Sequence, residues 1–182
     1  MAAKPSKPAA PTKATAKAAK PDKPAKAKAA FAKKNHPPTE AEFLARLPLP
    51  VGKKFESVRT FLAKHGVAED LYFYGPKTGW AFRYRRGAHS LATVTLHGDR
   101  LVGIVALDAA AQGEVDFTAL SEVGEQARRF ASGSPALVWL DLPLEGHGAA
   151  DFRVLLKAKL KTLPATQPAA LPPPPPAKKK TA

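Results

Sequence analysis

The sequence predicts an α+β fold: a single two-layer domain in which an antiparallel sheet of about five strands packs against helices, flanked by disordered tails. In the middle of the chain, apolar residues change from helical spacing to strand-like spacing and back. The strand-like segments mostly follow one another directly, which argues against a doubly wound parallel fold. Both ends consist mainly of alanine, proline and lysine, a composition that cannot form a core.

Composition divides the 182 residues into a tail over 1–37, a folded domain over 38–163 and a second tail over 164–182. The formal charge of +14 is concentrated in the tails. Ten lysines and one aspartate precede residue 37 and three lysines follow residue 163, so only +2 remains for the domain. Any preference for polyanions is therefore expected to belong to the tails.

The domain is predicted to begin with two helices. Thr39 and Glu42 have the spacing of a capping box, and Pro48 ends the short helix that they start. Apolar residues then recur at helical spacing over 51–65, before Gly66 provides a natural stop.

Four strands are predicted next, over 71–74, 79–86, 89–97 and 100–108. Gly98-Asp99 is the clearest hairpin signal. The last two of these strands are apolar on both faces, which indicates central positions in the sheet but leaves their register undecided.

Alternation within 79–86 places Trp80, Phe82 and Tyr84 on the core side and Arg83 and Arg85 on the other. Trp80 is interpreted as a core residue, with a stacking platform for bases as the alternative.

A third helix is predicted through the stripe from Leu120 to Phe130, with Asp116 as its cap and Gly133 just past its end. A strand over 136–142 and a last helix over 150–161 complete the domain. The last helix is expected to bury its apolar residues and to carry four basic residues on its other faces: Arg153, Lys157, Lys159 and Lys161.

Residues 61–163 resemble a bacterial domain-of-unknown-function family, number 3788. The resemblance is carried by the lysine-containing turn and Gly-Trp strand, the Trp-Leu strand and the lysine of the final helix: Lys77, Gly79, Trp80, Arg83, Tyr84, Trp139, Leu140 and Lys159. The chain departs from the family pattern at Leu101, where the family has a bulky aromatic residue, and in its long tails. The resemblance implies the fold and no activity, because the family has no established one.

No motif for catalysis or for a cofactor is found, and the absence of cysteine excludes disulfides and thiolate chemistry. The histidines (His36, His65, His89, His97 and His147) lie near predicted element ends without metal-ligand spacing. We therefore expect no catalytic residues, no metal and no cofactor. No secretory signal or membrane span is found, and the expected location is the cytoplasm.

One cluster of basic residues is a candidate site for a carboxylate or phosphate, with Tyr74 and Trp139 as candidate neighbours. The predicted ligand-binding residues are Lys77, Arg83, Arg85 and Lys159. The alternative is that the arginines form cross-strand salt bridges or are solvated on an exposed face.

The N-terminal tail is similar in composition to the lysine-, alanine- and proline-rich tails of linker histones, which implies sequence-blind, salt-sensitive contact with phosphates. The lysines predicted to contact nucleic acid are Lys4, Lys7, Lys13, Lys17, Lys20, Lys23, Lys26 and Lys28. The alternative is a tail that only keeps the protein soluble. The C-terminal LPPPPPAKKKTA is expected to form a polyproline II rod, either as a spacer or as a segment that docks on aromatic grooves.

These observations favour a non-enzymatic binding or adaptor module with non-specific nucleic-acid association through its tails. One alternative is a domain that binds or acts on a small anionic ligand near Lys77, Arg83 and Arg85. Another is an assembly surface for a protein partner. No interaction with a membrane is expected.

Overall fold

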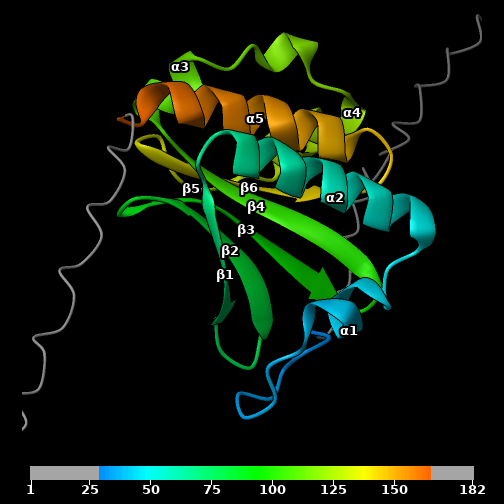
Figure 1. Ribbon diagram of the computed structural model, residues 1–182. Helices are drawn as coiled ribbons and strands as arrows, with labels where there is room; N and C mark the ends of the chain where they lie inside the picture. Colours follow the sequence, from blue (N-terminus) through cyan, green and yellow to red (C-terminus); the bar gives the residue numbers. More distant parts are fainter. Residues whose placement is uncertain (1–28, 165–182) are drawn as a thin grey trace, which may run out of the picture.

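Five α-helices and a six-stranded antiparallel sheet make up residues 29–164, the part of the chain that the computed structural model describes (Figure 1). The predicted α+β class is confirmed, with one strand more than expected. Most of the two predicted tails, residues 1–28 and 165–182, lies outside the described residues.

The helices are α1 (Glu40–Leu44), α2 (Leu49–Lys64), α3 (Ala109–Gly113), α4 (Glu122–Arg129) and α5 (Gly148–Thr162), with a single 3-10 turn η1 (Phe117–Ala119). The strands are β1 (Ala68–Phe73), β2 (Trp80–Arg86), β3 (His89–His97), β4 (Arg100–Asp108), β5 (Ser132–Ser134) and β6 (Leu137–Pro143). They lie in the order β1-β2-β3-β4-β6-β5, and every neighbouring pair is antiparallel. The two strands that are apolar on both faces, β3 and β4, are therefore central, as predicted.

Local sequence explains how the first helix begins. The Thr39 side chain accepts a hydrogen bond from the Glu42 backbone N–H at 3.2 Å, and the Glu42 carboxylate accepts one from the Thr39 backbone N–H at 2.7 Å. Both bonds of the predicted capping box are thus present. The chain passes through Pro48 directly into α2, whose first residue precedes the prediction by two.

The prediction that Asp116 caps the helix predicted over residues 120–130, which corresponds to α4, is wrong. Asp116 caps only η1, where its carboxylate accepts a hydrogen bond from the Thr118 backbone N–H at 3.0 Å. The helix α4 starts later, after Ser121. The Asp151 carboxylate of α5 accepts hydrogen bonds from the backbone N–H groups of Ser121 and Gly124 at the start of this helix. A carboxylate distant in sequence therefore supplies this cap.

Helices α2 and α5 lie side by side over one face of the sheet, and α3 and α4 lie near α5 (Figure 1). Phe55 of α2 packs against Phe82 of β2, and Phe152 of α5 lies against Gly103 of β4. All three aromatic side chains are buried. This helix-covered face of the sheet forms the core.

Lys159 is an exception to the expected pattern of α5. It was expected on a face of the helix away from the core, but it is 7% exposed and its Nζ donates to the Leu91 carbonyl of β3 at 3.2 Å. Burial lowers the pKa of Lys159, although the nearby Asp108 opposes that shift. The last helix therefore buries one of its four basic residues.

Residues 29–36 were assigned to the N-terminal tail by composition, yet they contact the sheet. Ala29 forms a β-bridge with His97, and the Phe31 carbonyl accepts from the Trp80 backbone N–H at 3.0 Å. The Phe31 ring stacks on Phe43 of α1, with ring centroids 5.7 Å apart. We call residues 29–36 the N-terminal strap, because they tie the start of β2 to α1.

Candidate functional site

The face of the sheet opposite α2 and α5, called the open face below, is covered by none of the described helices (Figure 1). Strand register assigns side chains to it at alternate positions, of which Ala81 and Thr95 are nevertheless buried. They include Asp70, Tyr72, Ala81, Arg83, Arg85, Thr93, Thr95, Val102, Ile104, Ala106, Leu137, Trp139 and Asp141. Of the described large apolar and aromatic residues with substantial exposure, Tyr72, Tyr74, Leu137 and Trp139 belong to this face.

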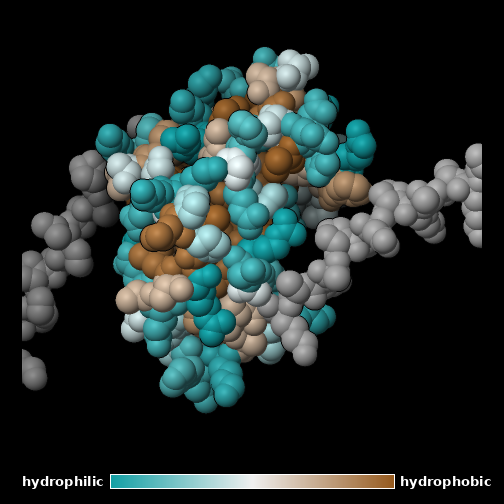
Figure 2. Space-filling model, turned by 90° about the vertical axis from the view of Figure 1, so that its right-hand side faces the viewer, coloured by the Kyte–Doolittle hydropathy of each residue, from teal (hydrophilic) through white to brown (hydrophobic). Residues whose placement is uncertain are grey.

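Figure 2 shows another side of the molecule, where apolar side chains gather in one area within a largely hydrophilic surface. Isolated exposed apolar residues are normal on a protein surface, so the arrangement on the open face is informative only where several of them meet.

One end of the open face carries a tyrosine cluster, made of Tyr72 and Tyr74 with Arg83 and Asp70. The guanidinium of Arg83 lies over the Tyr72 ring, 4.1 Å from its centroid, and the two tyrosine rings meet edge to face at 4.9 Å. The Tyr74 hydroxyl lies 3.1 Å from the Thr93 hydroxyl. The polar and aromatic groups of the cluster therefore have partners within it or on Thr93, although Tyr72 and Tyr74 are 43% and 39% exposed.

The two arginines of the predicted anion site converge on one carboxylate. Arg83 donates to Asp70 through two nitrogens, at 2.5 and 3.1 Å, and Arg85 Nε lies 3.5 Å from the same carboxyl group. The hydrogen bonds from Arg83 hold the pKa of Asp70 below its usual value. The cross-strand salt bridge that was the alternative to anion binding is thus present, and one positive charge of the trio is left over.

The structure does not bring the four predicted ligand-binding residues together. Lys77 is exposed in the turn between β1 and β2, whereas Arg83 and Arg85 lie along β2. Lys159 lies on the helix-covered face, where its ammonium is held by Leu91. Only Arg83 and Arg85 lie together. An anion bound there would interact with a group whose net charge is +1, because Asp70 neutralises one of the two arginines.

A second group of exposed side chains lies on β6 and was not singled out by the sequence analysis as a group. Leu137, Trp139 and Asp141 point to the open face, while the alternate residues Leu140 and Leu142 are buried. Leu137 and Trp139 are 41% and 45% exposed. We call these three residues the tryptophan patch. The alternation used for residues 79–86 could have found them, because 137–142 has the same period.

Asp141 differs from Asp70 in its electrostatic surroundings. Within residues 29–164 it forms no ion pair, and desolvation by its neighbours raises its pKa although the residue keeps exposed surface, with His97 acting in the opposite direction. The tryptophan patch thus combines an aromatic ring, an apolar side chain and an unpaired carboxylate.

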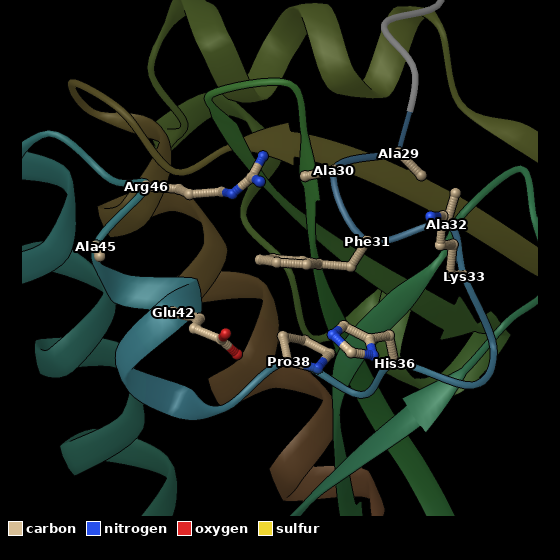
Figure 3. A pocket seen from close by; sticks show the side chains of 10 residues that line it. All are labelled: Ala29, Ala30, Phe31, Ala32, Lys33, His36, Pro38, Glu42, Ala45 and Arg46. Carbon is tan, nitrogen blue, oxygen red and sulfur yellow. The ribbon is translucent and has the colours of Figure 1, made fainter.

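Two cavities lie away from the open face. The larger, of about 550 Å³, is formed by the N-terminal strap and α1 (Figure 3). Phe31 crosses it, and the Arg46 guanidinium lies 5.0 Å from the centre of that ring. Lys33, His36 and Glu42 complete its polar lining, but Glu42 is already bound to Thr39. The cavity is open and its polar groups are mixed in sign, so it indicates no particular ligand.

The second cavity, of about 380 Å³, lies between α2 and the first two strands. Arg59 there binds Glu69 through two nitrogens, at 2.7 and 2.9 Å, and also contacts Glu40 and Glu56. The hydrogen bonds that Arg59 donates to the carboxylates of Glu69 and Glu40 raise the pKa of Arg59. The buried Tyr84 hydroxyl beside them has no partner among the described residues. This network ties α1 and α2 to β1.

No group of three or more metal-ligating side chains is present within residues 29–164, and none of the helices there is long and apolar enough to cross a bilayer. Four of the five described histidines lie at or next to element ends, as expected: His65 follows α2, His89 and His97 bound β3, and His147 precedes α5, while His36 lies in the N-terminal strap. Comparison with family models, with curated proteins and with solved structures gave no match. The resemblance to family 3788 therefore stays a prediction.

Proposed function

We propose that this chain is a non-enzymatic binding or adaptor module of the cytoplasm. Its domain presents the open face to a partner, and its basic tails associate with polyanions such as nucleic acid without sequence preference. The observation that carries the proposal is the one-sided sheet: helices cover one face, while the other exposes Tyr72, Trp139 and Leu137 within the described residues. They lie in two separate groups, Tyr72 on β1 and Leu137 with Trp139 on β6, and exposed aromatic side chains on a sheet are typical of binding surfaces.

The charge distribution supports tail-driven binding to polyanions. The segment before residue 37 has a charge of +9, whereas the domain is near neutral. Each lysine that contacts a phosphate of duplex DNA should steepen the dependence of affinity on salt by about 0.9 in a plot of log affinity against log salt.

The test uses the full-length chain and a variant in which the eight predicted tail lysines are replaced by glutamine: Lys4, Lys7, Lys13, Lys17, Lys20, Lys23, Lys26 and Lys28. Binding to a duplex DNA is measured at several salt concentrations. We expect steeply salt-dependent binding that the variant loses. A control variant with glutamine at Lys53, Lys64, Lys77 and Lys157, all exposed on the domain, should keep most of the binding. Equal affinities of the tail variant and the native chain would refute tail-driven binding.

A second candidate function is the binding of, or action on, a small anionic ligand near Lys77, Arg83 and Arg85. It is favoured by the two guanidinium groups that share the single carboxylate of Asp70. Arg83→Gln with Arg85→Gln should abolish thermal shifts produced by a panel of small carboxylates and phosphates. Arg100→Gln with Arg129→Gln is the matched control, because both arginines are exposed and distant in sequence from β2. Identical shifts in all three proteins would exclude this site.

A further inference from the structure

Among the described residues, the tryptophan patch contrasts with the tyrosine cluster because no stacking or ion-pair partner is found for it. The tyrosine cluster is held by Arg83 and Thr93, but within residues 29–164 no side chain stacks on Trp139 and no cation pairs with Asp141. Its neighbours on β4 are Ala106 and Ile104, which are small or apolar and add to an apolar surface. An exposed indole beside an unpaired carboxylate matches a ligand that offers both apolar rings and positive charge.

The chain itself contains such a ligand. Residues 172–176 are five consecutive prolines, and residues 178–180 are three lysines. Proline rings in the polyproline II conformation pack on aromatic side chains at a small entropic cost, because a run of prolines favours this extended conformation before it binds. Lysines placed after the prolines would supply a positive charge to pair with the carboxylate of Asp141.

The end of α5 is close enough to the tryptophan patch for this contact. The Leu160 carbonyl accepts from Arg86 Nη1 and Lys159 donates to the Leu91 carbonyl, both at 3.2 Å, so α5 ends beside the β2–β3 turn. Strand register puts Leu137 and Trp139 at that same end of the sheet. Residues 164–171 can span roughly 26 Å when extended. Passing around the end of the sheet and across two strands requires about 20 Å.

The lengths of the two surfaces also agree. Five prolines in the polyproline II conformation extend over about 15 Å. The strand from Leu137 to Asp141 covers about 13 Å. With the first proline near Leu137, the lysines would lie just past Asp141, within reach of its carboxylate.

We propose that residues 172–176 dock in cis on Leu137 and Trp139 of the open face, with Lys178, Lys179 and Lys180 beside Asp141. The C-terminal segment then occupies part of the surface that a partner would use, and a partner must displace it. The inference does not depend on polyanion binding by the N-terminal tail, since it concerns other residues and another type of contact.

The test is the accessibility of Trp139 to acrylamide, measured by fluorescence quenching in the full-length chain carrying Trp80→Phe, so that Trp139 is the only indole. In this background, replacement of all five prolines 172–176 by alanine should raise the quenching constant about two-fold, because the indole loses its cover. Replacement of Lys178, Lys179 and Lys180 by glutamine should give a smaller increase that high salt reproduces in the native tail.

Two controls make the outcome decisive. Alanine at Pro164 and Pro168 removes prolines from the same tail but not from the run, and should leave the quenching constant unchanged. Dilution should also leave it unchanged, because docking in cis does not depend on concentration. Equal quenching of the native tail and the five-alanine tail would show that Trp139 is uncovered and would end the proposal. Protection that disappears on dilution would assign the segment to another copy of the chain and equally overturn docking in cis.

Discussion

The two faces of the sheet use similar side chains in different ways. On the helix-covered face, aromatic rings such as Phe152 and Phe82 are buried against neighbours from other elements. On the open face, Tyr72 and Trp139 keep more than two fifths of their surface exposed. The first arrangement stabilises the fold through removal of apolar surface from water, whereas the second leaves apolar surface for something outside the described residues. Exposure therefore separates side chains that build this domain from those that are free to bind.

The largest effect should come from the helix-covered face. Phe152→Ala removes a fully buried ring that packs against Gly103, a residue with no side chain to occupy the space. We expect a loss of about 3–5 kcal/mol in the free energy of unfolding, measured by urea denaturation. Val154→Ala on the same helix, where Val154 is 39% exposed, should cost less than about 1 kcal/mol. Similar losses for both variants would contradict the assignment of this face as the core.

The next effect concerns Gly79, where the N-terminal strap contacts the start of β2. Gly79 has φ of +75°, and a Cβ there would lie 2.4 Å from the Phe31 carbonyl oxygen. Gly98 has φ of +66° but open space around it. Both alanine variants should lose about 1 kcal/mol from backbone strain.

The contact with Phe31 distinguishes the two variants. Gly79→Ala should in addition release the strap, which limited trypsin digestion would report as faster cleavage after Lys33 and Lys34. Gly98→Ala should be cleaved there at the native rate. Equal cleavage of the two variants would mean that the strap does not depend on the close approach at Gly79.

Lys159 provides a test that depends on pH. Burial lowers its pKa, so the folded protein binds this proton less tightly than the unfolded chain does. The resulting cost to stability is fully present below the folded-state pKa and disappears as the pH rises to the ordinary value of 10.5. Lys159→Met should therefore gain stability relative to the native protein at neutral pH, by less than Phe152→Ala loses, and the gain should shrink toward pH 10.5.

The control for this measurement is Lys157→Met, because Lys157 is exposed on the same helix. Its stability difference from the native protein should show no comparable dependence on pH. A difference for Lys159→Met that stays constant between neutral pH and pH 10.5 would show that desolvation of the ammonium is not what costs stability.

Sequence periodicity predicted most of the fold because it follows directly from side-chain burial. The bounds of β3 and β4 match the prediction residue for residue, since Gly98-Asp99 and the apolar runs define them. Strand β5 was missed because Ser132–Ser134 has no apolar side chain, and its pairing with β6 uses only the backbone. The burial of Lys159 could have been predicted, because it lies seven residues after Phe152 and therefore on the same side of α5.

The candidate site was less predictable than the fold. Alternation placed Arg83 and Arg85 on the open face, but the sharing of Asp70 depends on the register of β1 against β2, which short strands do not specify. Lys159 was predicted to bind a ligand together with these arginines, but a sequence gives no direct information on which side of a sheet a helix lies. The exposure of a surface residue can thus be predicted from the sequence pattern, whereas its interaction partners can be identified only from the tertiary structure.

The smallest effect compares the two ends of the open face. Tyr72→Ser loses the contacts with Arg83 and Tyr74, which together are worth about 1 kcal/mol at an exposed site. Trp139→Ser should cost less than about 0.5 kcal/mol if nothing covers the indole.

If the C-terminal prolines dock on Trp139, the same substitution costs more in the native chain than in the chain with alanine at 172–176. A double-mutant cycle in urea measures this difference. Additive effects of the two changes would place Trp139 with the ordinary exposed residues, whereas a coupling of the order of the Tyr72 loss would show that the tryptophan patch has its partner within the chain.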